Sequence, residues 1–420
     1  MKEMIDYLNY LTAEDKNELV KSLSLPSKKG LVLNTRRASK DVLKGYNLIQ
    51  DEYDDSLFIY SSEDEKMGKN VLHEAGAYYI LDPSACLISK NLISERKEIV
   101  LDMCAAPGGK TISYALKNPQ SLIIANDRSY KRATELSKNV ERLGLANVVV
   151  TSYEPSYFLK DFEDFFSVII LDAPCSGSGM FRKDESVKDD WSYEKVLSLL
   201  PIQDELLEVA YKLLKKGGVL SYSTCSFLEE EDEERVRKLI DNHPDMTPID
   251  LKHEEGFYYG TINKTVHLLP SHYKNGEGHY IALLRKEGEF KENKFTSNKY
   301  RFDKDLSLYT VKYKNEEYAL NEINDKLFKL DSLRFGLKLT NKDKYSKLDI
   351  DHAKSHYLTK IDIELDLEQA KKYLKGEELS IKTSKNGIVV LGYLGVSLGF
   401  GKASDNKVKN YYPKGLRKSL

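Results

Sequence analysis

The chain has 420 residues, of which 41% are hydrophobic, and its formal net charge at pH 7 is −2. This length suggests about two to three domains at roughly 150 residues each, and the hydrophobic content excludes a disordered protein. The near-zero charge excludes a protein that is basic throughout, so any nucleic-acid footprint must be local.

The chain shows no sequence feature of export or of membrane insertion. The N-terminus, MKEMIDYLNY, carries charges where a signal peptide needs an apolar core. The longest uncharged apolar run, Ile388 to Phe400, is interrupted by glycines and is too short to span a bilayer. The cysteines form no C-x-x-C pair, which weighs against a zinc site. We therefore expect a cytoplasmic protein with free thiols, no membrane contact and no metal.

The first 90 residues predict a small α+β module. Apolar residues at helical spacing predict one helix within residues 5–11 and a second within residues 12–23. Residues 31–37, LVLNTRR, predict a strand with a basic end. Its arginines, Arg36 and Arg37, either contact phosphate or lie in solvent, and the sequence leaves both possibilities open.

Residues 98–111, EIVLDMCAAPGGKT, predict a strand, a glycine turn and the start of a helix. Such a unit presents exposed backbone amides and forms a nucleotide-type cradle. The P-loop pattern and the G-x-G-x-x-G pattern are both absent.

Acidic residues follow the next two predicted strands. Asp127 follows the strand at residues 122–125 and is well placed to accept hydrogen bonds from a ribose diol. Its alternative role is the N-cap of the helix at residues 131–143, and the two roles are compatible. Glu154 lies just beyond the strand at residues 148–151.

The stretch SVIILDAPCSGSGMFRKD, residues 167–184, predicts a fourth strand followed by a reactive loop. Its apolar run is typical of a buried parallel strand, and Asp172 ends it. Pro174 stops strand pairing, and Cys175 and two glycines follow. The alternative is an ordinary loop with a buried cysteine.

We predict a helix at residues 205–216 and a fifth strand at residues 219–222, which is followed by Cys225. A further helix is expected at residues 229–240, with its acidic residues in the first turn. Strands that alternate with helices imply a parallel, doubly wound sheet. Because ligands bind beyond the carboxyl ends of such strands, the acids and Cys225 should converge on one site.

From about residue 288 the composition shifts to Lys, Asn, Asp and Tyr. Residues 366–374 predict a helix, and IVVLGYLGVSLGFGK, residues 388–402, predicts a β-hairpin. Tyr411 and Tyr412 lie within a basic segment, which suits RNA phosphates and stacked bases, although a solvated lysine-rich tail is equally consistent with it. The basic residues are Lys402, Lys407, Lys409, Lys414, Arg417 and Lys418.

Three segments, LDMCAAPGGKT, DAPCSGSGMFRKD and YSTCSF, resemble the signature motifs of the NSUN (Sun) family of RNA cytosine-5 methyltransferases. YYILDPSA and LLPSHYKNGEGHY resemble further motifs of the catalytic domain. The tail LGFGK…KNYYPKGLR resembles the PUA-like C-terminal domain of the RsmF-type branch, which acts on 16S rRNA. The resemblance therefore extends over nearly the whole chain.

The resemblance implies a Rossmann-like α/β methyltransferase core at residues 91–287, between an RNA-binding-type α+β module at 1–90 and a PUA-like region at 288–420. It implies S-adenosylmethionine as methyl donor, RNA as substrate and, as we expect, a monomer. The cofactor contacts that it implies are Cys104, Ala105, Ala106, Pro107, Gly108, Gly109, Lys110, Asp127, Glu154 and Asp172.

The family's nucleophile falls on Cys225 and its second cysteine on Cys175. A thiolate that adds to carbon 6 of cytosine makes carbon 5 nucleophilic toward the sulfonium methyl group. A free cysteine is mostly protonated at pH 7, so Lys110 is a candidate for lowering its pKa. Asp172 can bond the Watson–Crick edge of the base, and Cys175 or a water can assist release.

The sequence departs from the family at two positions. Leu81 stands where the first motif usually has Gln, and Glu154 stands where Asp is frequent. Alternatives to a 16S rRNA substrate are tRNA, a DNA cytosine methyltransferase with Cys175 as nucleophile, and an RNA-binding assembly factor whose methylation is dispensable.

Overall fold

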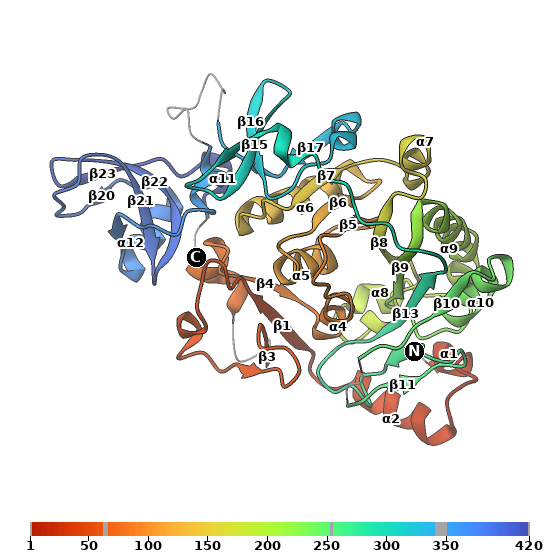
Figure 1. Cartoon of the computed structure of the whole chain (residues 1–420). Coiled ribbons are helices and arrows are strands. Elements are labelled where there is room, and N and C mark those ends of the chain that lie inside the picture. Colours follow the sequence, from red (N-terminus) through yellow and green to blue (C-terminus); the bar gives the residue numbers. More distant parts are fainter. Residues whose placement is uncertain (1, 62–65, 253–254, 341–350, 419–420) are drawn as a thin grey trace.

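The computed structural model describes residues 2–61, 66–252, 255–340 and 351–418. Its centre is a ten-stranded sheet with helices on both faces (Figure 1). Five neighbouring strands, in the order β9-β8-β5-β6-β7, run parallel, which confirms the predicted doubly wound sheet. They are β5 (Ile99–Asp102), β6 (Leu122–Asn126), β7 (Val148–Thr151), β8 (Phe166–Asp172) and β9 (Leu214–Thr224).

Antiparallel strands extend both edges of this sheet. On one side β13 (His279–Lys286) pairs with β9 and is followed outward by β12 (Val266–Leu268) and β11 (Tyr258–Tyr259), while β10 (Met246–Pro248) also pairs with β13. On the other side β17 (Ser332–Phe335) pairs with β7. A segment beyond residue 288 thus returns to the central sheet, and the domain boundaries expected at 90 and 287 stay predictions.

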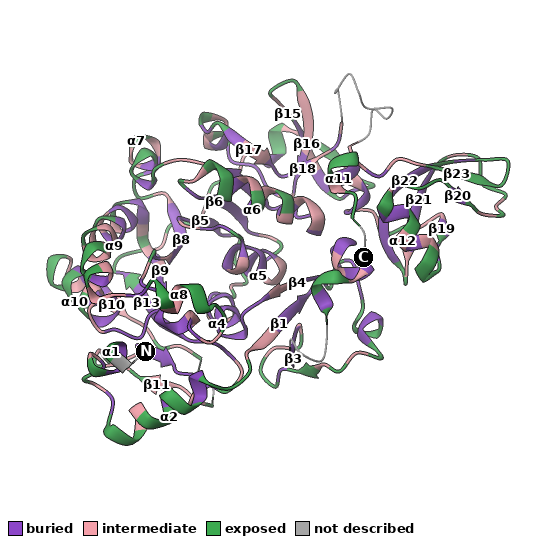
Figure 2. Cartoon of the chain, turned by 180° about the vertical axis from the view of Figure 1, so that it is seen from behind, coloured by how far each residue is buried: buried purple, intermediate pink, exposed green. Residues whose placement is uncertain are grey.

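Both faces of the parallel strands are buried, which is why they read as continuous apolar runs. Leu101 and Ile169 belong to the core on one face, and Val100 and Ile170 to the core on the other. Figure 2 shows these strands as buried. The helices that cover them are α4 (Pro83–Asn91), α5 (Gly109–Lys117), α6 (Tyr130–Leu143), α7 (Leu159–Phe162), α9 (Tyr193–Leu213) and α10 (Glu233–Asn242). The short helix α8 (Glu185–Asp189) has no buried residue.

The N-terminal module contains two helices and a four-stranded sheet. The second helix lies where it was predicted, but the first, expected within residues 5–11, ends at Asp6. Thr12 caps α2 (Ala13–Leu23) in a capping box with Asp15, which fixes where this helix begins. The other elements are α1 (Lys2–Asp6), β1 (Lys28–Leu33), β2 (Ile49–Gln50), β3 (Leu57–Ser61), α3 (Val71–Glu74) and β4 (Tyr78–Leu81).

The C-terminal third forms two smaller sheets. The first contains β14 (Arg301–Asp303), β15 (Leu308–Tyr313), β16 (Glu316–Leu320) and β18 (Leu337–Lys338). The second contains β19 (Ile363–Glu364), β20 (Leu379–Ser380), β21 (Gly387–Tyr393), β22 (Val396–Ser404) and β23 (Lys407–Asn410), and it packs with α11 (His352–Ser355) and α12 (Leu367–Lys375). The predicted hairpin is β21–β22, and the predicted helix is α12.

Short 3-10 helices connect several elements: Lys40–Leu43, Met67–Lys69, Pro155–Phe158, Ser178–Met180, Ser297–Lys299, Asp325–Lys329 and Lys414–Leu416. None of the helices that the structure describes is both long enough and apolar enough to cross a membrane.

Some predicted boundaries are wrong. The helix expected at residues 205–216 begins at Tyr193, and the strand expected at 219 begins at Leu214, because Leu214 already pairs with Phe166 before a shift in register. The helix expected at 229 begins at Glu233, because residues 229–232 form a turn.

Both roles considered for Arg37 are also wrong, whereas Arg36 stays exposed, and the strand expected to carry them ends at Leu33. Arg37 is 8% exposed, and it donates to the carbonyl and hydroxyl oxygens of Ser397 at 2.6 and 2.8 Å and to the carbonyl of Arg142 at 3.2 Å. Arg36 donates to the carbonyl of Gly144 at 3.1 Å. The carbonyls at the C-terminal end of α6 attract these cations, so the two arginines join the N-terminal module, α6 and the C-terminal sheet.

A second contact joins the same parts of the chain. Glu74 pairs with Lys418 at 2.8 Å and with His73 at 3.2 Å. Burial raises the pKa of Glu74, but the hydrogen bonds from His73 and Lys418 outweigh it and lower this pKa to about 2. Tyr412 is buried against the rings of His352 and Tyr373, so the expectation that it stacks on RNA bases is wrong.

Candidate active site

The predicted site residues gather at the carboxyl ends of the parallel strands, around two adjoining cavities. The acid-lined cavity, of about 430 Å³, is lined by Cys104, Asp127, Glu154, Asp172, Cys175 and Cys225, among others. The lysine cavity, of about 240 Å³, is lined by Cys104, Ala105, Ala106, Pro107, Gly109, Lys110, Asp172 and Cys225, among others. The two cavities share Cys104, Asp172 and Cys225, and β5 and β8 carry the chain to this point, where the strand order reverses.

Gly108 lines neither cavity but fixes the turn between β5 and α5. Its φ is +118°, and an added Cβ atom would lie 2.8 Å from Ile112 and 2.9 Å from Leu136. Only glycine fits this position, because a side chain would be strained as well as crowded. The Ala106–Pro107 peptide bond in the same turn is cis.

Asp127 has one carboxylate oxygen that accepts a hydrogen bond and one that makes only an ion pair. Its Oδ1 atom accepts from the backbone N–H of Ser129 at 2.9 Å, while Ser129 itself is the N-cap of α6. Its Oδ2 atom is buried with no hydrogen-bond partner among the described residues, and Arg132 lies 3.4 Å away. A buried acceptor without a donor is costly, so this oxygen fits a ribose hydroxyl that enters the acid-lined cavity. The alternative N-cap role is therefore wrong.

Glu154 lines the same cavity and lies at the N-cap position of the 3-10 helix Pro155–Phe158. Its side chain is exposed and caps nothing. It is therefore free to reach a ligand in the cavity.

A buried lysine, Lys110, and a half-buried aspartate, Asp172, form an ion pair where the two cavities meet. The Lys110 Nζ atom lies 2.7 Å from Asp172 Oδ2, and Ser223 donates to Asp172 Oδ1 at 3.1 Å. Burial alone would lower the pKa of Lys110, but the attraction of Asp172 and of Cys225 raises it above its ordinary value. Lys110 therefore remains a cation close to Cys225.

The two cysteines of the site are in direct contact. Their Sγ atoms are 3.1 Å apart, and the backbone N–H of Cys225 donates to the Cys175 sulfur at 3.3 Å. The hydrogen bond with Cys225 and burial both raise the pKa of Cys175 well above its ordinary value, and the charges of Glu231 and Asp172 add to this. Cys175 therefore stays a thiol.

Two residues that the sequence analysis missed hold the Cys175 loop in place. The buried carboxylate of Glu231 accepts from the backbone N–H of Ser176 at 2.8 Å and from its hydroxyl at 2.6 Å. Gln203 donates to the carbonyl of Pro174 at 2.9 Å and to Glu231 at 3.1 Å. Because Glu231 lies in an acidic run expected to be a helix start, nothing in the sequence marked it as an internal acceptor.

Three more missed residues, Asp82, Ser84 and His279, lie beside Lys110. Asp82 and His279 line the lysine cavity, and Ser84 connects them. Leu81, the departure from the family motif, lines the same cavity. The motif YYILDPSA was the one available signal for Asp82 and Ser84.

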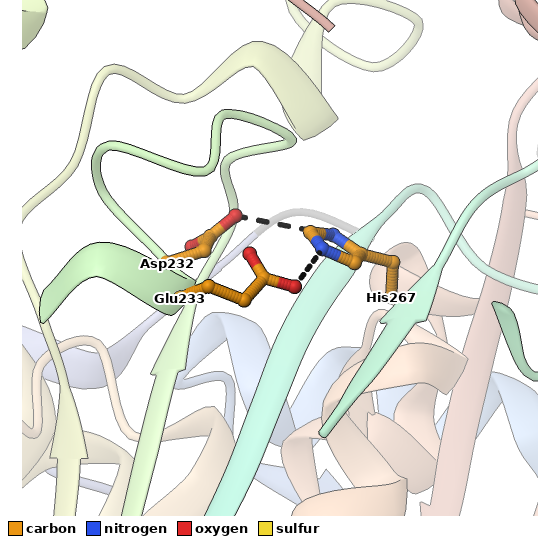
Figure 3. Close-up of side chains that lie close together, drawn as sticks. All are labelled: Asp232, Glu233 and His267. Atoms are coloured by element: carbon orange, nitrogen blue, oxygen red, sulfur yellow. Dashed lines mark hydrogen bonds and ion pairs between the residues drawn. The ribbon is translucent and has the colours of Figure 1, made fainter. Parts of the chain in front are cut away.

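A separate buried cluster brings together Asp232, Glu233 and His267 (Figure 3). His267 Nε2 lies 2.8 Å from Glu233 and Nδ1 lies 3.9 Å from Asp232, and Tyr10 stacks on the imidazole. Among the residues that the structure describes, this is the one group of three acidic, His or Cys side chains close enough to hold a metal ion. Burial and Glu233 raise the pKa of Asp232, whereas His267 lowers that of Glu233 against the effect of burial. The cluster thus pairs one carboxylate with an imidazole and anchors the N-terminal segment to the catalytic part.

Comparison with known families gives two matches. Residues 90–285 match the family described as 16S rRNA methyltransferase RsmB/F. Residues 360–418 match the family described as the methyltransferase RsmF PUA domain.

Similar proteins cover nearly the full length. Ribosomal RNA small subunit methyltransferase F of Vibrio vulnificus is 29% identical over 93% of this chain and 91% of its own. The protein of the same name from Shewanella oneidensis is 28% identical over 96% of this chain and 93% of its own.

Solved structures agree with these matches. A methyltransferase homologue from Pyrococcus horikoshii is 29% identical with a TM-score of 0.56, and it covers 67% of this chain and 93% of its own. NSun6 from the same organism, solved with SFG, is 22% identical with a TM-score of 0.58, and it covers 69% of this chain and 99% of its own, which shows a shared fold. Residues 90–285 are therefore a methyltransferase domain of the 16S rRNA methyltransferase RsmB/F family, and residues 360–418 are a PUA domain of the RsmF type.

Proposed function

We propose that this rRNA methyltransferase transfers a methyl group from S-adenosylmethionine to carbon 5 of a cytidine in 16S rRNA, with Cys225 as a covalent nucleophile. The observation that carries the proposal is the contact of the two cysteines beside the Lys110–Asp172 pair, where the two cavities meet. When bound, S-adenosylmethionine supplies an electrophilic methyl group on its sulfonium.

The acid-lined cavity is the proposed cofactor site. The Oδ2 atom of Asp127, which has no hydrogen-bond donor, fits a ribose hydroxyl, and the exposed Glu154 can reach the same sugar. Cys104 and the following turn would lie along the cofactor, and the glycine at position 108 keeps that turn tight. The acidic lining also suits the positive charge of a sulfonium.

The lysine cavity is the proposed site of the flipped cytosine. The base must leave its stack to reach Cys225. The Cys225 thiolate adds to carbon 6 while N3 of the base takes a proton from water, and this proton neutralises the charge that develops on the ring. The Asp172 carboxylate accepts a hydrogen bond from the protonated N3 and so holds the proton there. Lys110 lies close enough to stabilise both the thiolate and the Asp172 carboxylate.

Cys175 is the proposed assistant in release. Once carbon 5 carries the methyl group, it must lose its proton. The electrons of the broken C–H bond restore the double bond between carbons 5 and 6, and the electrons of the carbon 6–sulfur bond leave with the Cys225 sulfur as a thiolate. Water takes the proton, and the Cys175 thiol, 3.1 Å away, donates a hydrogen bond to the departing sulfur. Its raised pKa supports this role, because only the thiol can donate.

The PUA domain is the proposed RNA-docking part. Lys402 on β22 and Lys409 on β23 lie directly opposite each other, and both are exposed. Like charges in that arrangement are unfavourable, and neither lysine has an ion-pair partner among the described residues. A phosphate of the RNA backbone would relieve the repulsion.

We also propose that the protein works as a monomer in the cytoplasm. Two thiols in contact would be oxidised in an oxidising compartment, and both are free here. A reducing compartment preserves the nucleophile.

The test of the covalent step uses single and double cysteine variants with an rRNA fragment. Cys225→Ala should form no adduct and should be inactive, whereas Cys175→Ala should still attack and should accumulate a protein–RNA adduct that survives denaturing electrophoresis and disappears with ribonuclease. The double variant should form none, because attack precedes release. Cys86→Ala, which removes a buried cysteine outside both cavities, is the control and should behave like the native protein.

An adduct in Cys225→Ala, with none in Cys175→Ala, would reverse the assignment and favour DNA-type chemistry. The substrate is tested separately, by bisulfite mapping of rRNA and tRNA from a strain that lacks the gene. A lost 5-methylcytidine in 16S rRNA supports the proposal, and a loss in tRNA alone contradicts it. No loss in either RNA would favour an assembly factor.

A further inference from the structure

We infer that His279 is a positioning residue that, together with Ser84 and Asp82, orients the Lys110 ammonium beside Cys225 and Asp172. This inference rests on the proposed function, because it assigns a role to Lys110 in the attack on the base. His279 lies at the start of β13, which pairs with β9 so that Tyr280 faces Thr224. The register therefore brings His279 to the level of Cys225.

A continuous chain of hydrogen bonds runs through His279. Lys110 Nζ lies 3.4 Å from His279 Nε2, and His279 Nδ1 lies 2.6 Å from the Ser84 hydroxyl. The Ser84 hydroxyl donates to Asp82 Oδ1 at 2.6 Å, and the backbone N–H of Ser84 donates to the same atom at 2.8 Å. Asp82 is the N-cap of α4, so the last residue of this hydrogen-bonded series is fixed to a helix.

These hydrogen bonds determine which nitrogen of His279 carries the proton. Because the Ser84 hydroxyl gives its only hydrogen to Asp82, it can only accept from His279 Nδ1. The proton is therefore on Nδ1, and Nε2 keeps its lone pair for the Lys110 ammonium.

The surroundings of His279 keep it neutral. Burial lowers its pKa well below the ordinary value, and the cations Lys110 and Lys183 lower it further. An imidazolium would have no lone pair left for Lys110. Eight other ionisable groups line the lysine cavity with His279. The acids and thiols are Asp82 before α4, Asp102 on β5, Cys104 after β5, Asp172 on β8 and Cys225 after β9. The others are Lys110 on α5, Lys183 after the 3-10 helix Ser178–Met180, and Tyr79 on β4.

The consequence for Lys110 is a fixed orientation. An ammonium has three donors on a flexible stem. Asp172 accepts one and His279 accepts a second, so the direction of the third is set by the other two. A base in the lysine cavity would then meet an oriented N–H donor rather than a rotating one.

The test measures how fast the covalent adduct forms in the Cys175→Ala background, where release is slow. His279→Phe keeps a ring of similar size but offers no acceptor, and we expect it to slow adduct formation by ~10- to 100-fold, the usual effect of removing a partner that orients an essential group. His279→Gln places an amide oxygen within reach of Lys110 and should restore most of the rate. Ser84→Ala leaves Lys110 untouched and should give an intermediate rate.

Two further measurements separate positioning from folding. The affinity for S-adenosylmethionine and the melting temperature should be unchanged in the Gln variant. Nitrogen NMR of the full chain at neutral pH should show His279 protonated on Nδ1, and this tautomer should be lost in Ser84→Ala.

Equal adduct rates in the His279→Phe and His279 proteins would overturn the inference, as would an imidazolium or an Nε2-protonated ring at neutral pH. Equally slow Phe and Gln variants would also overturn it, because they would indicate a packing role. Failure of the proposed function looks different, since Cys175→Ala with native His279 would then form no adduct at all.

Discussion

Replacement of Asp127 by alanine tests the proposed cofactor site. The carboxylate has one buried oxygen without a hydrogen-bond donor, and a ribose hydroxyl is the donor that the proposal supplies. A hydrogen bond to a charged group contributes ~1.5–3 kcal/mol. At about 1.4 kcal/mol for each tenfold change in Kd, Asp127→Ala should weaken binding of S-adenosylmethionine by roughly 10- to 150-fold.

Calorimetric titration of the full-length protein measures this loss directly. Because Asp127 also accepts from the backbone N–H of Ser129, its removal should lower stability slightly, and melting curves must show that the variant is folded. Asp189→Ala, which removes an exposed carboxylate that lines neither cavity, is the matched control and should bind like the native protein. An unchanged Kd in folded Asp127→Ala would remove Asp127 from the cofactor site.

Three other predictions concern RNA binding and the contacts between the parts of the chain. Charge reversal of Lys402 and Lys409 together should raise the RNA KM and flatten the salt dependence of binding without changing cofactor affinity; equal RNA affinity would favour a merely solvated lysine pair. Arg37→Ala should reduce the free energy of unfolding in urea by ~3 kcal/mol, because it leaves buried acceptors without donors; a loss below ~1 kcal/mol would refute this role. Since the folded pKa of Glu74, about 2, lies below its ordinary 4.5, its contribution is present above pH 4.5 and is lost as the pH falls toward 2. This contribution to the free energy of unfolding amounts to up to ~3 kcal/mol. If the ion pair with Lys418 supplies it, the stability of Glu74→Gln should not show this decrease between pH 4.5 and pH 2 in acid unfolding.

The parallel sheet was predictable because its strands are buried on both faces. Residues 148–150 and 168–171 are unbroken apolar runs, and a helix with clear periodicity, Tyr130–Leu143, precedes the first of them. The acids and Cys225 were predictable as a group, since each follows such a strand. By contrast β17 pairs with a strand about 180 residues earlier, and its sequence SLRF carries no signal of that partner.

The residues that surround the chemistry were harder to predict than those proposed to perform it. Glu231 lies in a run of acids and looks unremarkable in the sequence, and the motif LLPSHYKNGEGHY marked the region of His279 but not its role. Their importance comes from partners far along the chain, Lys110 and Ser176. Arg37 was misread for the same reason, because its acceptors are carbonyl oxygens that no side-chain pattern reveals.

The pairing of β17 with β7 determines where the chain can be cut. A fragment that ends near residue 287 would leave the backbone of Val148–Thr151 as an open edge with a flat, β-branched sequence. Open edges of this kind recruit a strand from another copy, so such a fragment should precipitate although its apolar core is complete. A fragment that extends to Thr340 keeps β17 and covers the edge. The shortest soluble catalytic fragment should therefore include about fifty residues beyond the last strand of its own domain, and a separate RNA-binding fragment should begin only after them.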